Sequence, residues 1–444
     1  MDPQKYYSCP YRCECSAGLG ARVTRIRNHE PLFRNHASPK GFSMNRPRLK
    51  LATVILAAAV LALLVGMRLG ARGAAPKASS AMPPASIPTF STEDLGREAF
   101  FYVGGEYAGP SGKEVMHGAM YVEVWVPKKV TRPYPIVMFH GNGQTGTIWR
   151  QTPDGRPGWA YYLLHQGYVV YMVDYPARGR SPYVPSMDGP LNIRTALELE
   201  QIWTAPVESA GDFPRKKLYT EWPSDAPHKG MMGDPVFDNF IKGQLQFVGK
   251  QAELAVPAGV ALLDKIGTPV ILLTHSQGGG IGFNVADERP NLIAGMVAIE
   301  PGGPQIGSVD LAKVANVKKN PDSWGLTPMP MHYDPPVDKP EDLHVYLEDK
   351  SERSDEVPCY MQEEPVHKLV AFEKFHVLSI SAEGTYHRVY DHCIPKWINQ
   401  AGGHDEFVRL EDVGIHGNMH EMFLDKNSDE VIKFIDDWIR KNVK

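Results

Sequence analysis

The chain has 444 residues, of which 43% are hydrophobic and 22% are charged, so it can bury a large core and is neither a wholly disordered nor a fibrous protein. The net charge of −4 divides unevenly, with +7 on residues 1–50 and −11 on the rest of the chain. Because the acidic body has no basic patch interleaved with aromatic residues, nucleic acid is excluded as an expected partner.

The basic leader, residues 1–50, is followed by an uncharged apolar run of seventeen residues from Leu51 to Met67. This run is short for a transmembrane helix and long for the core of a signal peptide, so a cleaved signal and a membrane anchor both remain open. Met44 begins a complete signal pattern, so Met1 and Met44 both remain candidate starts; with the second, residues 1–43 would be an upstream extension. In either case the body is expected to be exported, to the periplasm or the medium.

Residues 68–89 are rich in Pro, Ala and Ser without periodicity, which predicts a linker before one folded domain of residues 90–444. Apolar strands alternate with helices along this domain, and that order predicts an α/β fold with a mostly parallel central sheet and helices on both faces. The expected strands cover residues 118–127, 136–139, 169–173, 295–299 and 375–381, with another from residue 270, a last one near residue 407, and a C-terminal helix from 429 to about 443.

Two insertions interrupt the alternation, at about residues 186–250 and 301–370. Long insertions on a compact sheet are usually lids or binding loops. The first is expected to be a helical lid and includes a predicted helix over residues 191–203. Five aromatic residues of this lid could line a substrate pocket, although packing of the lid onto the body is favoured for most of them: Trp203, Trp222, Phe237, Phe240 and Phe247.

Two groups of cysteines are treated differently. Cys9, Cys13 and Cys15 lie in the leader and have no matching Cys/His pair, so no zinc site is expected there. Beyond residue 50 the sequence contains only Cys359 and Cys393. Since an exported protein meets an oxidising compartment, these two are predicted to form a disulfide.

The segment from Pro269 to Phe283, PVILLTHSQGGGIGF, carries the clearest chemical signal. A buried strand runs into a serine between small residues and is followed by a helix, which is typical of a nucleophile elbow. That motif is G-x-S-x-G; Gly278 provides the second glycine, whereas Thr274 replaces the first. By itself the motif is of moderate specificity, and it favours Ser276 as a nucleophile.

A glycine-rich loop, His-Gly-Asn-Gly at residues 140–143, follows an earlier apolar strand. Attack of a serine on an acyl carbon puts negative charge on the carbonyl oxygen, which two backbone N–H groups must stabilise. One should come from Gln277, directly after the nucleophile, and the other from Asn142. A plain glycine turn is the alternative interpretation of this loop.

With these motifs the chain resembles the α/β-hydrolases and, more narrowly, a branch of exported bacterial esterases. The resemblance covers roughly residues 90–444 and implies an α/β-hydrolase fold. In this branch the residue at Thr274 need not be glycine, and the acid follows the strand after the elbow directly, which is Glu300 here. Some members carry cysteines where this chain has Asn142 and Gly143, so any role of those cysteines does not transfer. The motifs that carry the resemblance are HGNGQTG, TPDGRPGWAYYLLHQGYVVYMVDYPARGRS, THSQGG, AIEPGG, WGLTPMPMHYDPPV and GIHGNMH.

The general base is expected in the motif GIHGNMH, which offers His416 and His420. The glycine and asparagine between them break any helix, so a metal site built on helical spacing is not expected. Leu424 also stands where a zinc motif beginning at His420 requires a second histidine. The resemblance favours His420 as the base, with His416 as the alternative.

Three carboxylates are candidates for the acid that holds the imidazolium. Glu300 ends an apolar strand, where a charge is costly unless it is paired, and a histidine is a suitable partner. The usual α/β-hydrolase acid follows a later strand, where Glu383 or Asp391 stands. The placement of Glu300 and the resemblance both favour it.

The sequence therefore predicts an exported serine hydrolase that cleaves small-molecule carboxylic esters through an acyl-enzyme intermediate, with no metal and no organic cofactor. Two alternatives remain. The same triad could act on lactones or amides or transfer an acyl group to another acceptor. The chain could also be a non-catalytic binding protein on a hydrolase scaffold, which the presence of a complete set of Ser, Glu and His disfavours.

Overall fold

The computed structural model describes residues 83–303 and 306–444. The predicted leader, its cysteines, the apolar run of residues 51–67 and the linker up to residue 82 lie outside the described residues. The described residues from Pro83 onward form one compact unit. Within them, no helix has the length and apolar character needed to cross a membrane.

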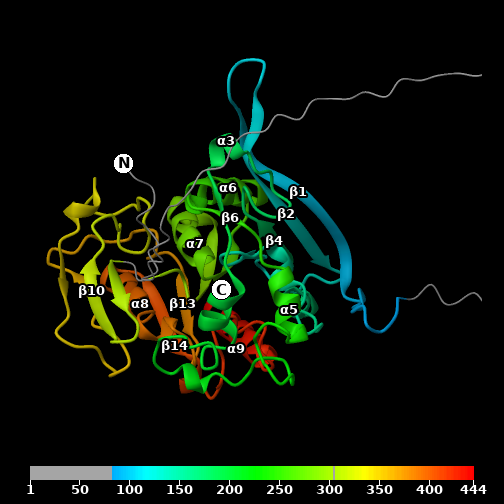
Figure 1. The fold of residues 1–444 in the computed structure, drawn as a ribbon. Helices are drawn as coiled ribbons and strands as arrows, with labels where there is room; N and C mark the ends of the chain where they lie inside the picture. The colour runs from blue at the N-terminus through cyan, green and yellow to red at the C-terminus, as the bar shows by residue number, and fades with distance from the viewer. Residues whose placement is uncertain (1–82, 304–305) are drawn as a thin grey trace, which may run out of the picture. The chain divides into compact units, whose positions relative to one another are not determined.

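An eight-stranded sheet forms the centre of the domain (Figure 1). Its strand order is β1-β2-β4-β3-β7-β8-β13-β14. The first three strands pair antiparallel, and every neighbouring pair from β4 to β14 is parallel, so the predicted mostly parallel sheet is confirmed. The strands are β1 (Leu95–Ala108), β2 (Val115–Pro127), β3 (Ile136–Phe139), β4 (Val170–Asp174), β7 (Val270–His275), β8 (Ile293–Ile299), β13 (His376–Ser381) and β14 (His404–Arg409).

Helices cover both faces of the sheet, and each face has its own apolar core. Successive side chains of a strand point to opposite faces. Accordingly Val137 and Phe139 of β3 pack with α6, α7 and α8, whereas Ile136 and Met138 pack with α2 and α9. The helices are α2 (Trp159–His165), α3 (Pro185–Asp188), α4 (Ala196–Leu199), α5 (Pro235–Lys242), α6 (Gln251–Ile266), α7 (Gln277–Glu288), α8 (Cys393–Gln400) and α9 (Ser428–Asn442).

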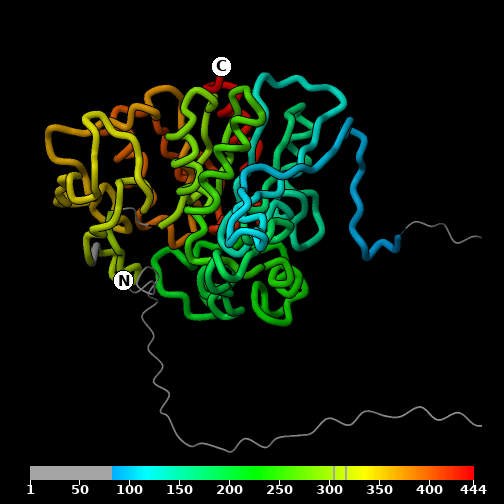
Figure 2. The backbone as a smooth tube through the Cα atoms, turned by 90° about the horizontal axis from the view of Figure 1, so that it is seen from above, coloured from blue at the N-terminus to red at the C-terminus, as the bar shows by residue number. Residues whose placement is uncertain are grey.

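The antiparallel edge of the sheet was not fully predicted. β1 has no counterpart among the predicted strands, and β2 begins three residues earlier than predicted, at Val115. Most side chains of β1 are exposed, so the strand has no apolar alternation to reveal it. Its pairing with β2 along almost its whole length stabilises it instead. Figures 1 and 2 show this edge on the opposite side of the domain from the second insertion.

The predicted continuous helix over residues 191–203 is wrong. This part of the lid insertion (residues 186–250) contains the short strand β5 (Leu191–Asn192), the one-turn helix α4 and a π-helical turn, η3 (Glu200–Thr204). β5 pairs with β6 (Phe247–Val248), so Leu191 and Asn192 are extended and cannot be helical. Thr195 then caps α4 through a capping box with Glu198, so the helix begins only after the cap.

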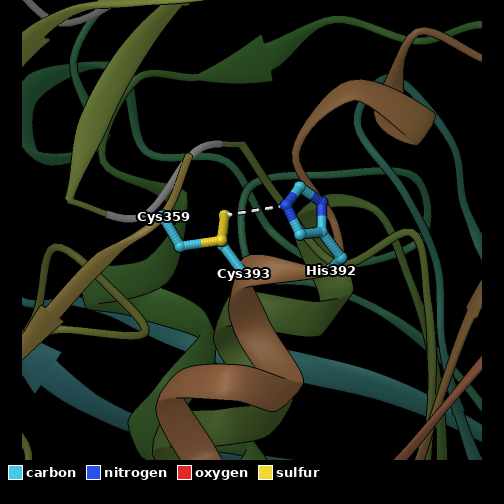
Figure 3. A group of neighbouring side chains, drawn as sticks. All are labelled: Cys359, His392 and Cys393. Carbon is cyan, nitrogen blue, oxygen red and sulfur yellow. Dashed lines mark hydrogen bonds between the residues drawn. A yellow bond between two sulfur atoms is a disulfide. The ribbon is translucent and has the colours of Figure 1, made fainter. Parts of the chain in front are cut away.

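The second insertion (residues 301–370) contains two small antiparallel strand pairs and a 3-10 helical turn, η6 (Pro340–Asp342). A disulfide ties it to the sheet domain by joining Cys359 to Cys393, the first residue of α8, as predicted; the Cα atoms are 5.3 Å apart. Figure 3 shows His392 beside this disulfide, with Nε2 at 3.6 Å from Cys393 Sγ. Because both sulfurs are in the disulfide, this group offers no thiolate to a metal. The pairs are β9 (Gly307–Asp310) with β10 (Ala315–Lys319), and β11 (Val345–Leu347) with β12 (Tyr360–Gln362).

Candidate active site

Ser276 lies at the turn between β7 and α7, in a backbone conformation that a residue with a side chain rarely adopts. Its φ and ψ are 52° and −120°. Its N–H donates to the carbonyl of Ile299, 3.0 Å away, and its own carbonyl accepts from the N–H groups of Gly279 and Gly302 at 2.8 and 2.7 Å. These bonds hold the strained turn in place, as a nucleophile elbow requires.

The close passage of β7 and α7 explains which neighbours of Ser276 must be small. A Cβ atom at Gly278 would lie 2.8 Å from the carbonyl oxygens of two β3-end residues, so this position requires glycine. Thr274 is fully buried, and its Oγ1 donates to Val297 O at 3.2 Å. A Cβ atom at Gly282, across from it on α7, would come within 2.7 Å of Thr274 Cγ2. The threonine is therefore accommodated because α7 has a glycine opposite it.

His420, in the loop after β14, and Glu300, directly after β8, form a buried pair. His420 Nδ1 lies 2.6 Å from Glu300 Oε2, and both side chains are completely buried. The carboxylate also accepts hydrogen bonds at 2.8 Å from the N–H of Ala382 and from Thr385 Oγ1. Three donors thus converge on Glu300, which fixes the carboxylate and the orientation of the imidazole ring.

The second ring nitrogen of His420, Nε2, is buried and has no hydrogen-bond partner among the described residues. The ring lies parallel to that of His387, at 11° and 4.5 Å between centroids, and also stacks on Trp203 at 5.7 Å. His275 Nε2 lies 3.0 Å from the carbonyl of His420. Packing therefore holds the ring while leaving Nε2 available for a proton.

Burial controls the protonation of this pair. It lowers the pKa of His420 well below 6.5, because the charged imidazolium would lose its hydration, and the charge of His387 acts in the same direction. Burial also raises the pKa of Glu300, an effect that His387 and the hydrogen bonds from Ala382 and Thr385 oppose. At neutral pH the imidazole is therefore neutral and able to accept a proton.

The two alternative acids pair with other histidines. Glu383 Oε2 lies 3.2 Å from Nδ1 of His416, whose side chain is 62% exposed. Asp391 Oδ1 lies 2.8 Å from Nδ1 of His387, and both of these side chains are buried. In the described part of the chain, neither alternative acid makes a hydrogen bond to His420.

The loop of residues 140–143 follows β3, next to β7 in the sheet. A Cβ atom at Gly141 would lie 2.8 Å from His275 Nδ1, so the chain can pass here only as glycine. The backbone N–H of Asn142 has no hydrogen-bond partner among the described residues, and Gln277 is the first residue of α7. Both expected oxyanion donors thus follow neighbouring parallel strands, on the same edge of the sheet as Ser276.

Comparison with known proteins identifies the family. Residues 134–325 match the alpha/beta hydrolase fold family. Over 354 residues, 78% of this chain and 91% of the relative, the chain is 38% identical to a protein of a fungal species named "Probable secreted lipase phiG". The chain belongs to the α/β-hydrolase family. The solved structure of a novel bacterial esterase, 22% identical, has the same fold; its TM-score is 0.50, and the match covers 82% of this chain and all of that one.

In this α/β-hydrolase the lid insertion contacts the candidate site through Trp203 and Arg194. Trp203 is 2% exposed and stacks on His420, so it packs the lid onto the body and also contacts the expected base. Phe247 is only half-buried. The favoured interpretation of the lid aromatics as packing residues agrees with the burial of the other four in the core of the α2 and α9 face: Trp203, Trp222, Phe237 and Phe240.

Two further residues of this α/β-hydrolase were missed in the sequence. Gln144 Nε2 donates to both carboxylate oxygens of Glu421 at 2.8 and 2.7 Å, while Gln144 Oε1 accepts from the N–H of Gly141 at 3.2 Å. This bridge connects the oxyanion loop to the residue beside His420. Burial raises the pKa of Glu421 to about 8. Although Gln144 stands in the motif HGNGQTG, nothing in the sequence predicts its partner, because their contact joins segments 277 residues apart.

Two groups of buried side chains have donor atoms close enough together for a metal ion, and both include His420. One adds His275 and Glu421, and the other adds Glu300 and His387. In each group the carboxylate is already hydrogen-bonded, to Gln144 or to His420 itself. A metal would have to break these bonds, so the donor sets do not suit a resident metal ion.

Proposed function

We propose that this protein is an exported serine hydrolase that cleaves carboxylic esters through an acyl-enzyme intermediate on Ser276. It is an esterase- and lipase-like hydrolase, as its family membership and its fungal relative indicate. The proposal assigns the acting residues and the route of the reaction, and it names small-molecule esters as substrates.

In the proposed reaction, Ser276 Oγ attacks the acyl carbon while His420 Nε2 takes its proton. The backbone N–H groups of Asn142 and Gln277 donate to the oxyanion of the tetrahedral intermediate. The intermediate collapses with cleavage of the bond to the alcohol, which receives the proton from His420. Water then attacks the acyl group by the same steps and regenerates Ser276.

Glu300 is proposed to hold the imidazolium during these steps. The observation that carries this proposal is the buried hydrogen bond from His420 Nδ1 to Glu300, combined with an unpartnered Nε2 on the other side of the ring. A carboxylate in this position fixes the tautomer and stabilises the positive ring. This assignment corresponds to the branch of α/β-hydrolases whose acid follows the strand after the elbow directly.

Export is supported by two observations. The Cys359–Cys393 disulfide is typical of proteins from oxidising compartments, and the fungal relative is named as secreted. The segment proposed to direct export, residues 51–67, is either a cleaved signal or an anchor that keeps residues 90–444 attached to the membrane.

The same residues could instead serve lactones, amides or acyl transfer, and the proposal of ester hydrolysis is tested by covalent labelling. A serine-directed fluorophosphonate should label the protein once. Ser276→Ala should abolish both the labelling and the hydrolysis of para-nitrophenyl butanoate, because no other group replaces the nucleophile.

Ser308→Ala, which changes an exposed serine of the second insertion, is the matched control and should keep both. Labelling that survives in Ser276→Ala refutes the assignment of the nucleophile. Hydrolysis of amides in preference to esters refutes the substrate class. Transfer of the acyl group to an acceptor other than water, in preference to hydrolysis, refutes it too.

A further inference from the structure

Two arginines beside the oxyanion loop, Arg178 and Arg194, form no ion pair with any described carboxylate. This is unusual in the molecule, because the fully buried Arg388 pairs with Glu356 and Arg180 pairs with Asp174. A buried or half-buried guanidinium without a counter-ion is costly. The two unpaired positive charges therefore indicate a site at which an anionic group from outside the described residues binds.

Arg178 is 2% exposed and lies between the loops that carry the expected oxyanion donors. It donates from NH1 to the carbonyl of Gly141 and from NH2 to the side chain of Gln277, each at 3.1 Å. Its Nε is buried and has no partner among the described residues. Burial lowers the pKa of Arg178 to about 10, so it still carries its charge at neutral pH.

Arg194 approaches the same loop from the lid insertion. It is half-buried, and its Nε donates to the side-chain oxygen of Asn142 at 3.2 Å. Its guanidinium carbon lies 5.5 Å from the ring centre of Trp203, which stacks on His420, and 6.0 Å from that of Phe247. Since the described residues give its two terminal nitrogens no hydrogen-bond partner, they are free to bind a ligand.

The lid places Arg194 through the pairing of β5 with β6. Asn192 of β5 lies opposite Phe247 of β6, and Arg194 follows two residues later. Phe247 also lies 5.8 Å from the guanidinium of Arg178, so one aromatic ring contacts both cations. The two positive charges are thus held beside the oxyanion loop by aromatic contacts and by hydrogen bonds to uncharged groups, among them one of 2.8 Å from Arg178 to Gln251, rather than by carboxylates.

We propose that Arg194, with the charge of Arg178 behind it, binds a carboxylate group carried by the substrate, so that this hydrolase prefers anionic esters. A guanidinium binds a carboxylate through two parallel hydrogen bonds, and two terminal nitrogens are what this needs. The inference rests on the proposed function, because it names the substrate class of the same site. If Arg194 served only to hold Asn142, neutral and anionic esters would depend on it equally.

The test compares two esters with the same leaving group and the same number of acyl carbons: mono-para-nitrophenyl glutarate, which is anionic, and para-nitrophenyl pentanoate, which is neutral. A second pair, para-butanoyloxybenzoate and phenyl butanoate, carries the charge on the alcohol side. In Arg194→Gln, kcat/KM for the anionic member of at least one pair should fall about 10- to 100-fold, as for the loss of a charged hydrogen bond. The neutral member should fall by a clearly smaller factor, so that the ratio of the anionic to the neutral kcat/KM falls in at least one pair.

Arg194→Lys keeps the charge without the planar fork and should recover part of the preference. Arg97→Gln, on the exposed strand β1, is the matched control and should leave all four rates unchanged. Equal losses on neutral and anionic esters, or unchanged rates on both pairs, overturn the anion site. Because the neutral esters report ester hydrolysis by themselves, such a result leaves the proposed function standing.

Discussion

The loop after β14 carries two histidines four residues apart, and each contacts a glutamate. His420 lies 2.6 Å from Glu300 with both side chains fully buried, whereas His416 lies 3.2 Å from Glu383 and is 62% exposed. The two pairs contain the same chemical groups. They differ in the dielectric around them, in the donors that orient the carboxylate and in what the second ring nitrogen of the histidine can reach.

The surroundings of the two glutamates explain the difference. Glu300 is fully buried and accepts from the N–H of Ala382 and from Thr385. Glu383 is half-buried, accepts from the N–H of Gly417 and lies 3.6 Å from Arg215. A pair whose histidine is exposed to solvent contributes little and is screened by salt. Burial, rather than residue type, therefore distinguishes the pair that is proposed to support catalysis.

The largest expected effect separates the two histidines. His420→Ala should lower kcat by about 10⁵- to 10⁶-fold, because the same imidazole is proposed to take the proton from Ser276 and to give it to the leaving alcohol. His416→Ala is the matched control, and its kcat should stay within about threefold of the original because its ring lies in solvent. Steady-state hydrolysis of para-nitrophenyl butanoate measures both. A large loss in His416→Ala with activity retained in His420→Ala would reverse the comparison.

The next effect separates the acids. Glu300→Gln should lower kcat by about 10³- to 10⁴-fold, because the amide cannot stabilise the imidazolium and favours the wrong tautomer. Glu383→Gln and Asp391→Asn should change kcat much less, since these carboxylates contact other histidines. Circular dichroism should show an unchanged fold in all three. Near-normal turnover in Glu300→Gln would assign the acid to one of the other two.

A smaller effect concerns pH. Burial lowers the pKa of His420, so the neutral imidazole should persist below pH 6.5, and activity should be lost only as the pH falls through the lowered value. At about pH 6 the protein should therefore keep half or more of its kcat/KM at about pH 8. If the base were a solvated histidine of ordinary pKa, kcat/KM at about pH 6 would be about a quarter of its value at about pH 8. A profile of kcat/KM between about pH 4 and pH 9 distinguishes the two.

The sequence was most informative where local backbone geometry sets the requirement. A serine after a buried strand, with Gly278 two residues later, favoured an elbow, because an elbow forces close passage of strand and helix. The parallel strands could be predicted for the same kind of reason, since continuous apolar runs are typical of strands buried on both faces. The exposed strand β1 and the conformation of residues 191–203 could not be predicted in this way, because pairing with another strand decides both.

By itself, then, the sequence determined the α/β class, the candidate nucleophile and the disulfide of Cys359 with Cys393. The first two follow from patterns within single segments, and the disulfide follows from the number of cysteines beyond residue 50. The sequence left the acid open among three carboxylates and gave no sign of the unpaired Arg178 and Arg194. The sheet brings together loops from distant segments of the chain. Their arrangement decides which histidine contacts which carboxylate and which arginines have no carboxylate partner. Burial is a property of that assembly, and only the tertiary structure decided it.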